Sequence, residues 1–292
     1  RRAGLGAGAG APRMSRPICS AVIPTYNGLR WLREGLPALR EAQRLTPTLM
    51  EILVVSDGCT DGTAETVARE FPGIRVLALP SNGGFAAACN LGVEAAMGRI
   101  VALLNNDVRV EPRFLEPILE RFEAEDDLFA VAPRILVPRW NHADESPNAP
   151  VFRWGFLGGR LLGMDPARPG PARPVPILYA CGAAAVVRRD RFLELGGFDT
   201  LFHPFYWEDA DLSYRAWKAG WRVVYEPRSV VSHAHHGTII GGDGDRAVET
   251  IRVRNHLLFM WKNYSDPGWW GWHLAGVLGR VAGLLDRVDT LC

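Results

Sequence analysis

Residues 51–63 read EILVVSDGCTDGT and give the clearest indication of how the chain folds. The first half, Glu51 to Ser56, is a short apolar run that predicts a buried strand, and the second half is a polar loop rich in glycine. Three further strand-like runs follow the same rule, with stretches of helical spacing between them. This alternation is typical of βαβ units, so the sequence predicts an α/β fold with a doubly wound, mainly parallel sheet. The other predicted strands span 18–23, 74–79 and 99–104, and the predicted helices span 28–43, 61–70 and 84–97.

The loops that follow the four predicted strands are unusually polar. Ligands of such sheets bind beyond the carboxyl ends of the strands, where these loops would meet. Glycine, asparagine and aspartate are also ordinary turn formers, and Thr60 or Asp61 could cap a helix, so one such loop indicates little. Four of them at one edge predict a binding site. The loops are Pro24-Thr25-Tyr26-Asn27-Gly28, Asp57-Gly58-Cys59-Thr60-Asp61-Gly62-Thr63, Ser81-Asn82-Gly83-Gly84-Phe85 and Asn105-Asn106-Asp107.

Length and composition are those of an ordinary globular enzyme. The 292 residues suffice for one large α/β domain with a short extension, and a formal net charge of +1 gives no indication of a nucleic-acid partner. The five cysteines are odd in number, widely spaced and without a CxxC pair, which predicts reduced thiols in a cytosolic protein. Residues 1–15 begin Gly/Ala-rich, and no apolar segment follows the leading arginines. We therefore expect a flexible tail there and no signal peptide.

The second half of the sequence is less regular. Residues 133–176 are rich in Pro, Gly and Arg, and a long irregular stretch in a compact enzyme predicts a binding loop or lid. An apolar, strand-like run resumes at 177–187. A helix is predicted at 209–219 and a further strand at 222–225, which leads to a group of histidines.

An acidic cluster lies at the start of that predicted helix. Residues 205–212 read FYWEDADL, which places Glu208, Asp209 and Asp211 within four positions beside aromatic rings. Like charges this close raise one another's pKa, which suits a general base. Acidic residues also favour the N-terminus of a helix, and this could explain one or two of them. Three beside an aromatic wall favour a functional role.

Two further places offer metal ligands. Asp107 follows a fully apolar strand, so its carboxylate would lie at the edge of the sheet and could bind Mg²⁺ or Mn²⁺; an ordinary turn residue is the alternative. Three of the seven histidines occur in Ser232-His233-Ala234-His235-His236-Gly237, beyond the last predicted strand. An imidazole there could join a metal that a carboxylate already holds, and a surface loop is the alternative.

Seven short motifs follow one another between about Ile18 and Tyr264. They are Pro24-Thr25-Tyr26-Asn27, Asp57 to Thr63, Asn82-x-Gly84-Phe85 with Asn90 and Gly92, Leu104-Asn105-Asn106-Asp107, Gly196-Gly197-Phe198-Asp199, Glu208-Asp209-x-Asp211-Leu212 and Arg254-Asn255. Together they resemble the family-2 inverting glycosyltransferases of the GT-A fold and, within that family, the bacterial rhamnosyltransferase-like enzymes. One such motif would be weak, but seven in family order are specific.

The resemblance implies a domain plan and an activity. Residues 16–264 would form the GT-A domain, with a nucleotide-binding half at 16–110 and an acceptor-side half at 111–264. The enzyme, of hexosyltransferase type, would transfer a sugar from a nucleotide-diphosphate donor to a hydroxyl of a glycan or lipid-linked saccharide in bacterial cell-surface polysaccharide synthesis. The first donor expected is dTDP-rhamnose, and UDP-hexose or UDP-galactofuranose are the alternatives.

The resemblance also implies roles for individual residues. Asp209 matches the catalytic base, and Glu208 would orient it or hold acceptor hydroxyls. Asp107 matches the last acid of the family's metal-binding Asp-x-Asp, and His233 matches a further ligand of Mg²⁺ or Mn²⁺. Asp57 would lie against a uracil or thymine base. The other donor-binding residues would be Pro24, Thr25, Asn27, Asn82, Gly84, Phe85, Asn90 and Asn106, and the acceptor-binding residues would be Gly197, Phe198, Asp199, Trp207 and Asp211.

Two positions depart from the family pattern. Asn105 replaces the first acid of the metal motif, so the cation would rest on Asp107, His233 and diphosphate oxygens, and should bind weakly without donor. Ser56 stands where many relatives have an acid, which leaves recognition of the uracil or thymine base to Asp57. His235 and His236 compete with His233 for the ligand role, and the sequence leaves that choice open.

Residues 269–288 predict an apolar helix within a C-terminal extension at 265–292. His273, Arg280 and Arg287 recur every seven residues and form one polar stripe, which predicts an amphipathic helix in place of a spanning one. Tryptophans at its start suit a membrane interface, so we expect peripheral contact with the inner face of the cytoplasmic membrane. Packing on the catalytic domain or on the partner in a homodimer is the alternative.

Two other functions fit the sequence less well. A nucleotidyltransferase usually has a Gly-rich loop with Arg or Lys after its first strand, and residues 24–27 do not supply one. A non-catalytic adaptor that binds sugar nucleotides would have lost base or metal residues. Asp107, Asp209 and His233 are all present.

Overall fold

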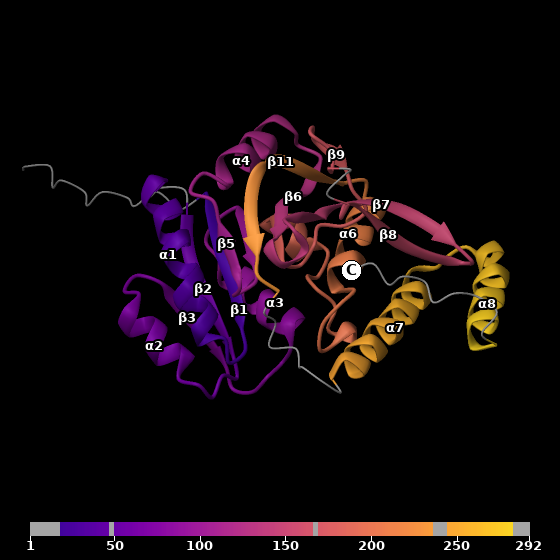
Figure 1. The fold of residues 1–292 in the computed structure, drawn as a ribbon, viewed down its shortest axis with the longest axis horizontal. Coiled ribbons are helices and arrows are strands. Elements are labelled where there is room, and N and C mark those ends of the chain that lie inside the picture. The colour runs from indigo at the N-terminus through magenta and orange to yellow at the C-terminus, as the bar shows by residue number, and fades with distance from the viewer. Residues whose placement is uncertain (1–17, 47–49, 166–168, 236–243, 283–292) are drawn as a thin grey trace, which may run out of the picture.

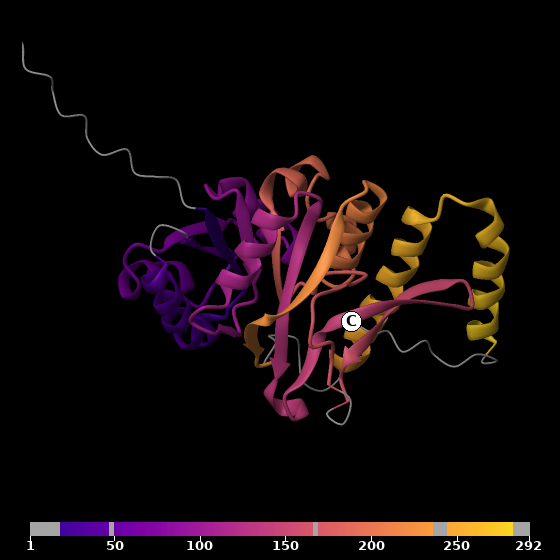
Figure 2. The ribbon, with the colours of Figure 1, turned by 90° about the horizontal axis from the view of Figure 1, so that it is seen from above.

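The computed structural model describes residues 18–46, 50–165, 169–235 and 244–282. Figures 1 and 2 show a twisted sheet that carries helices on its faces, with the N-terminal strands at one end and two C-terminal helices at the other. The strands are β1 (Cys19–Thr25), β2 (Met50–Asp57), β3 (Arg75–Leu79), β4 (Ile100–Leu104), β5 (Val108–Val110), β6 (Leu128–Val137), β7 (Ala143–Arg153), β8 (Phe156–Gly163), β9 (Val175–Pro176), β10 (Ala184–Arg188) and β11 (Arg222–His233). The helices are α1 (Leu29–Leu45), α2 (Thr63–Glu70), α3 (Phe85–Ala95), α4 (Leu115–Ala124), α5 (Arg189–Glu194), α6 (Glu208–Lys218), α7 (Gly244–Asn263) and α8 (Pro267–Val281), with short 3-10 turns η1 (Pro138–Trp140) and η2 (Thr200–Phe202).

The sheet is mixed and mostly parallel. Among the described residues its main path runs β3-β2-β1-β4-β10-β6-β11-β5, with β7 beside β6, β8 beside β7, and β9 beside β11. Strands β1 to β4 are parallel, as the sequence predicted, and each predicted strand and helix up to residue 97 lies within two residues of the observed one. Strand β10 runs antiparallel between β4 and β6, so the sheet continues from the N-terminal half of the chain into the second half.

The alternation of side chains along the central strands explains why a hydrophobic core lies on each face of the sheet. Ala21 and Ile23 pack in the core that α1 covers, whereas Val22 between them packs in the core that α3 covers. Strand side chains point to opposite faces in turn, so a continuous apolar run such as β1 is buried on both faces. Helix α3 lies so close that a Cβ on Gly92 would come within 2.2 Å of Val22.

Three expectations for the second half were wrong. Residues 133–176 are not an irregular lid, because they contain the end of β6 and the hairpin of β7 and β8. The pairing between β7 and β6 ends at Asp144. The prolines of β7 that follow Asp144 therefore remove no hydrogen bond between these two strands. The run at 177–187 is a strand only from Ala184, and the strand that begins at Arg222 continues to His233 past an irregularity between Glu226 and Val230.

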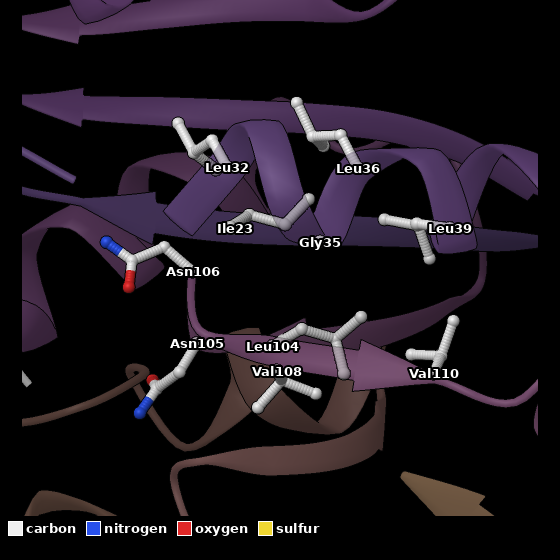
Figure 3. Close-up of a pocket in the computed structure, with 10 residues that line it drawn as sticks. All are labelled: Ile23, Leu32, Gly35, Leu36, Leu39, Leu104, Asn105, Asn106, Val108 and Val110. Carbon is white, nitrogen blue, oxygen red and sulfur yellow. The ribbon is translucent and has the colours of Figure 1, made fainter. Parts of the chain in front are cut away.

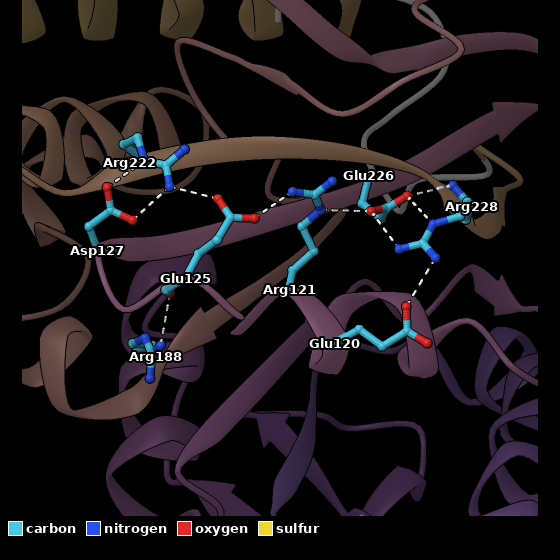
Figure 4. A network of polar contacts seen from close by, with 8 residues as sticks. All are labelled: Glu120, Arg121, Glu125, Asp127, Arg188, Arg222, Glu226 and Arg228. Carbon is cyan, nitrogen blue, oxygen red and sulfur yellow. Dashed lines mark hydrogen bonds and ion pairs between the residues drawn. The ribbon is translucent and has the colours of Figure 1, made fainter. Parts of the chain in front are cut away.

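A network of ion pairs joins α4 and the chain that follows it to β11 (Figure 4). The guanidinium of Arg121 lies 2.9 Å from Glu226, and that of Arg228 lies 3.0 Å from the same carboxylate. Arg222, the first residue of β11, pairs with Glu125 at 2.6 Å and with Asp127 at 2.5 Å. The members of these pairs on β11 lie between Arg222 and Arg228, in the first part of the strand. The polar site described below lies at the end of the strand, near His233.

Helix α8 packs against the rest of the chain with its polar side, and its apolar side faces outward. Its polar residues point inward: His273 is fully buried with its Nδ1 3.0 Å from the carbonyl oxygen of Gly155, and the Arg280 guanidinium lies 3.4 Å from the Phe156 ring centre. Its outward side is apolar, with Trp272 62%, Leu278 67% and Val281 82% exposed. Figure 2 shows the β7–β8 hairpin reaching this helix. Arg287 and the end of the predicted helix lie outside the described residues, as does the tail at 1–15.

Within the described residues, no helix combines the length and apolar character needed to cross a bilayer.

Candidate functional site

Three of the polar loops are joined by side-chain hydrogen bonds at the carboxyl ends of β1, β2 and β4. Asn106 donates from Nδ2 to the hydroxyl of Thr25 at 2.8 Å. The side-chain oxygen of Asn27 accepts from the backbone N–H of Thr60 at 2.8 Å. Asn27 has a positive φ of 48°, a conformation that asparagine tolerates better than most residues. The loops at 24–28, 57–63 and 105–107 therefore form one continuous polar edge.

Asp57 ties the fourth loop to this edge. Its two carboxylate oxygens accept from the backbone N–H groups of Gly83 and Gly84 at 2.6 and 3.0 Å. Burial raises the pKa of Asp57, and these two amide donors oppose that rise. Asn82 is exposed beside them and accepts from Gly84 at 3.0 Å. Pro24, in contrast, is buried within β1, where it pairs with Val55.

A small apolar cavity lies beneath α1 next to this edge (Figure 3). Its volume of about 10 Å³ is room for about one water molecule. Asn105 and Asn106 lie at one end of it, and their amide groups point away from the aliphatic side chains. The cavity is therefore a packing gap and is too small for a substrate.

Asn90 and the loop that contains Gly197 form a separate unit. The Asn90 amide both donates to the carbonyl of Phe198 and accepts from its N–H, each at 2.9 Å. Gly197 has a φ of +71°, and a Cβ there would come within 2.6 Å of Asn90. Asp199 accepts from Leu201 at 2.9 Å and pairs with Lys262 at 2.7 Å. Asn90, Lys262 and the loop from Gly196 to Thr200 line an open hollow of about 380 Å³.

Asp107 and His233 lie next to each other, as the sequence indicated. Strand β11 pairs with β5 so that His233 is opposite Val108, the residue after Asp107. The Nε2 atom of His233 is 3.2 Å from Oδ1 of Asp107. Both side chains are nearly enclosed, at 7% exposure each.

A second acid, which the sequence did not indicate, completes this cluster. Glu145 of β7 lies 2.6 Å from Nδ1 of His233 through Oε1 and 2.6 Å from Nε2 of His235 through Oε2. The ligand atoms of Glu145, His233 and His235 lie within 4.8 Å of one another, close enough to hold a metal ion. His236, the third histidine of the motif, lies outside the described residues. The only sequence signal for Glu145 is an acid beside Asp144 in a segment that we expected to be a loop.

Charge explains the ionisation of this cluster. Burial alone would lower the pKa of His233, but its contacts with Asp107 and Glu145 outweigh burial and raise it to about 9. Burial would raise the pKa of Glu145, and the contacts with His233 and His235 outweigh it and hold that pKa below its usual range. The cluster thus attracts a positive charge, which a proton or a metal cation can supply.

Glu208 and Asp209 begin α6, and neither forms an ion pair with Lys, Arg or His within the described part of the chain. Asp209 accepts from the N–H of Gly182 at 2.8 Å and from that of Ala210 at 2.7 Å. Glu208 is 4% exposed, and its Oε2 has no hydrogen-bond partner among the described residues. Burial raises the pKa of both carboxyl groups, and the neighbouring Asp209 raises that of Glu208 further.

Two hydrogen bonds connect this acidic pair with the metal-ligand cluster. Asp209 accepts from Gly182, and the next residue, Ala183, accepts from the N–H of Asn105 at 2.9 Å. Asn105 lies two residues before Asp107. The structure thus brings Asp209, Asp107 and His233 to one edge of the sheet.

Asp211 and Trp207, which the family resemblance assigned to acceptor binding, are both buried. Asp211 is fully buried and accepts from Arg215 and Lys262 at 2.8 Å and from Asn263 at 2.9 Å. Trp207 stacks on His256 with ring centres 4.0 Å apart. Both side chains thus hold α6 against α7.

Asn255 fixes the aromatic segment before α6. Its Nδ2 lies 2.8 to 2.9 Å from the carbonyl oxygens of Phe202, Phe205 and Tyr206. The neighbouring Arg254 contacts the carbonyl of His203. The Arg254-Asn255 motif therefore secures the approach to Glu208 and Asp209.

The sequence and fold match known sugar-transferring proteins. The family model described as Glycosyl transferase family 2 matches residues 20–196. N-acetylglucosaminyl-diphospho-decaprenol L-rhamnosyltransferase of Mycobacterium tuberculosis is 26% identical over 296 residues, which cover 92% of this chain and 93% of the relative. Pre-mycofactocin glycosyltransferase of the same species is 34% identical over 222 residues, which cover 74% of this chain and 42% of that protein.

Solved structures of glycosyltransferases share the fold. The mannosyltransferase PcManGT from Pyrobaculum calidifontis, in complex with GDP-Man and Mn²⁺, has a TM-score of 0.59 and 18% identity, with coverage of 96% of this chain and 79% of that one. GalNAc-T7, crystallised with UDP, GalNAc and Mn²⁺, has a TM-score of 0.60 and 18% identity, with coverage of 75% and 44%.

Proposed function

This chain belongs to glycosyl transferase family 2, and from that premise we propose that it is a metal-dependent inverting enzyme that transfers a sugar from a nucleotide diphosphate to an acceptor hydroxyl. It is a glycosyltransferase of the GT-A fold. The proposed acceptor is a glycan or lipid-linked saccharide of the bacterial cell surface, and the proposed donor sugar is rhamnose, because the relative matched over nearly its whole length is a rhamnosyltransferase. UDP-hexose and UDP-galactofuranose are the alternative donors.

The observation that carries the catalytic part of the proposal is the burial of Glu208 and Asp209 with no cationic partner among the residues that the structure describes. Burying a carboxylate without a cationic partner costs several kcal/mol of folding free energy, so a chain retains such groups where they serve a purpose. The same pair argues against a non-catalytic adaptor, because an adaptor has no need for buried acids of this kind.

In the proposed reaction Asp209 takes the proton from the acceptor hydroxyl. A carboxyl group with a raised pKa is a better proton acceptor near neutral pH than an ordinary one. The acceptor oxygen forms a bond to the anomeric carbon while the bond to the diphosphate breaks on the opposite side. A single displacement of this kind inverts the anomeric centre.

Asp107 and His233 are the proposed ligands of Mg²⁺ or Mn²⁺. Neighbouring ligands of one octahedral ion with bonds of about 2.1 Å are about 3 Å apart, and the contact between these two side chains is 3.2 Å. A carboxylate oxygen and an imidazole nitrogen together fit Mn²⁺ well. The ion would neutralise charge on the departing diphosphate. Asn105 adds no charge, so we expect weak metal binding in the absence of donor.

Donor binding is assigned to the polar edge. Thr25, Asn27, Asn82 and Asn106 would contact the nucleotide, and Gly84 and Phe85 would shape the pocket. Each oxygen of Asp57 already accepts one backbone N–H and retains a second lone pair for the N–H of a base. Pro24, buried within β1, would support this wall from inside.

Three side chains receive a structural assignment. We assign Asn90 to holding the loop of Gly197, Phe198 and Asp199, because its side-chain amide forms two hydrogen bonds with the backbone of Phe198. We assign Asp211 and Trp207 to joining α6 and α7, because both are buried in that interface. The loop of Gly197, Phe198 and Asp199 remains our proposed acceptor-side contact.

The outward side of α8 is the proposed membrane contact. It consists of apolar residues that include Trp272, Leu274, Leu278 and Val281. Tryptophan favours the membrane interface, and the matched rhamnosyltransferase acts on a decaprenol-linked substrate by its name. The proposed division is a transferase domain at 16–264 and an interfacial extension at 265–292, on the inner face of the cytoplasmic membrane. In liposome co-sedimentation, Leu278→Ser should pellet less than the wild type and the control Leu45→Ser should not; equal pelleting of all three would reject this contact.

A panel of nucleotide sugars with Mn²⁺ or Mg²⁺ tests the function. The true donor at one hundred times its Kd should stabilise the fold by about 2.7 kcal/mol, a rise in Tm of roughly 5 to 10 °C. The same donor should release nucleoside diphosphate when an acceptor is added, and EDTA should stop the release. Turnover that persists in EDTA would reject the metal-dependent reaction, and failure of every nucleotide sugar to bind would reject transfer from such donors.

A further inference from the structure

Glu145 occupies an unusual position for an acid. It lies on β7, one residue after Asp144, and it is 8% exposed. Among the described residues no Lys or Arg forms an ion pair with it, and its partners are the rings of His233 and His235. A buried carboxylate whose partners are two imidazoles requires an explanation beyond packing.

Strand pairing holds Glu145 in front of the histidines. Leu136 of β6 pairs with Asp144 of the antiparallel β7 and with Ser232 of the parallel β11. Glu145 and His233 are the next residues on these two strands, so their side chains point to the same face, and they meet at 2.6 Å. Asp144 itself is fixed, because it accepts from the N–H groups of Ile135 and Ser146 and from the hydroxyl of Tyr225. The carboxylate of Glu145 is therefore presented from a rigid backbone.

The geometry determines the tautomer of His233. An ionised carboxylate only accepts hydrogen bonds, so the Nδ1 atom that faces Glu145 at 2.6 Å carries a hydrogen. Asp107 faces Nε2 at the longer distance of 3.2 Å, so Nε2 is the nitrogen that gives up its hydrogen when the ring is neutral or binds a metal ion. Carboxylates that accept from the far nitrogen of a metal-bound histidine orient the ring and strengthen the ligand.

We propose that Glu145 is the positioning residue for the metal site, that it fixes His233 with Nε2 toward Asp107, and that His235 supports Glu145 without binding the metal. This rests on the metal-dependent function proposed above. The competing arrangement places the ion among Glu145, Nδ1 of His233 and Nε2 of His235. It would remove the hydrogen from Nδ1 and would not use Asp107.

Mn²⁺ binding to the full chain, measured by electron paramagnetic resonance with and without UDP, distinguishes these arrangements. Glu145→Ala should weaken Mn²⁺ binding by about 10- to 100-fold. Glu145→Gln keeps one acceptor oxygen and should lose less Mn²⁺ affinity than Glu145→Ala. His235→Ala should lose less Mn²⁺ affinity than His233→Ala does. Asp107→Asn should lose as much affinity as His233→Ala. The control Glu120→Gln, at the exposed end of the ion-pair network, should bind Mn²⁺ as the wild type does.

The tautomer gives a second measurement that needs no metal. In the metal-free wild type, the ¹⁵N shifts of the His233 ring at a pH where it is neutral should report hydrogen on Nδ1, and this preference should disappear in Glu145→Ala. Circular dichroism confirms that each variant is folded.

Three outcomes overturn the proposal, and they differ from one another. Wild-type Mn²⁺ affinity and an unchanged tautomer in Glu145→Ala would show that Glu145 positions nothing. A loss in His235→Ala equal to that in His233→Ala, with Asp107→Asn unaffected, would establish the competing arrangement. Absence of Mn²⁺ binding by the wild type, with and without UDP, would reject the proposed metal function itself.

Discussion

Glu226 and Glu208 are both carboxylates with almost no exposed surface, 0% and 4%, yet their surroundings are opposite. Glu226 lies in the ion-pair network of Figure 4 between the guanidinium groups of Arg121 and Arg228. Burial would raise its pKa, and these hydrogen bonds outweigh burial and lower it. Glu208 faces no guanidinium group in the described ranges, and burial together with Asp209 raises its pKa. The same side chain thus stabilises the fold in one place and costs folding free energy in the other.

The difference separates a structural group of charges from a candidate catalytic one. In the network each acid faces an arginine, which holds α4 and the following chain to β11. At the other end of β11 the acids face imidazoles, backbone N–H groups or, for one oxygen of Glu208, no partner among the described residues. Uncompensated burial is the signature that we associate with the proposed chemistry.

The largest stability effect is expected in the network. Glu226→Ala removes the carboxylate that Arg121 and Arg228 share and should lower the free energy of unfolding by roughly 3 kcal/mol near neutral pH. Because the folded-state pKa of Glu226 is lowered, its contribution is present above the unfolded pKa of about 4.3 and is lost as pH falls through the folded value. Urea unfolding at pH 7 and at low pH measures both. A variant as stable as the wild type at pH 7 would show that the ion pairs of Glu226 do not stabilise the fold.

The effect of the matching change at the candidate site should have the opposite sign. Glu208→Gln removes a charge without changing shape and should stabilise the fold by about 0.5–2 kcal/mol at pH 8 while lowering turnover. The folded pKa of Glu208 is raised, so the cost of its charge is absent below the unfolded pKa and grows as pH rises toward the folded value. The gain in stability should therefore increase from pH 5 to pH 8. A loss of stability that deepens with pH would show that Glu208 has an unrecognised cationic partner.

The smallest effect is expected at the exposed end of the network. Glu120 and Arg228 form a 3.0 Å pair whose side chains are both more than half exposed. Glu120→Gln should change the free energy of unfolding by no more than about 0.5 kcal/mol, because water and salt screen such pairs. Urea unfolding in low and in high salt checks this, and a change as large as that of Glu226→Ala would show that burial is not what distinguishes members of the network.

The sequence predicted the N-terminal half of the fold because its signals there are local. Each strand from β1 to β4 is a short apolar run, and each is followed by its own polar loop, so no distant contact is needed to recognise it. The convergence of Asp107, His233 and Asp209 at one edge followed from the same rule about strand ends and from the family resemblance.

What the sequence could not give depends on contacts between distant residues. Glu145 meets His233 only because β7 and β11 both pair with β6, and Pro and Gly obscured the strand on which it lies. The sequence left open which side of α8 would pack on the domain, because it gave no sign that Arg280 would lie over the ring of Phe156. Asn90 and Asp211 look like ligand-binding residues in a motif, but their partners, Phe198 and Lys262, lie 108 and 51 positions further along the chain.

The most direct test compares donor binding with turnover in Asp209→Asn, using the nucleotide sugar that stabilises the wild type. If Asp209 removes the acceptor proton, the variant should bind the donor with nearly the wild-type Kd in the presence of Mn²⁺, and its kcat should fall by at least about 100-fold. A variant that binds donor normally and retains wild-type kcat would contradict the role of Asp209 as the base.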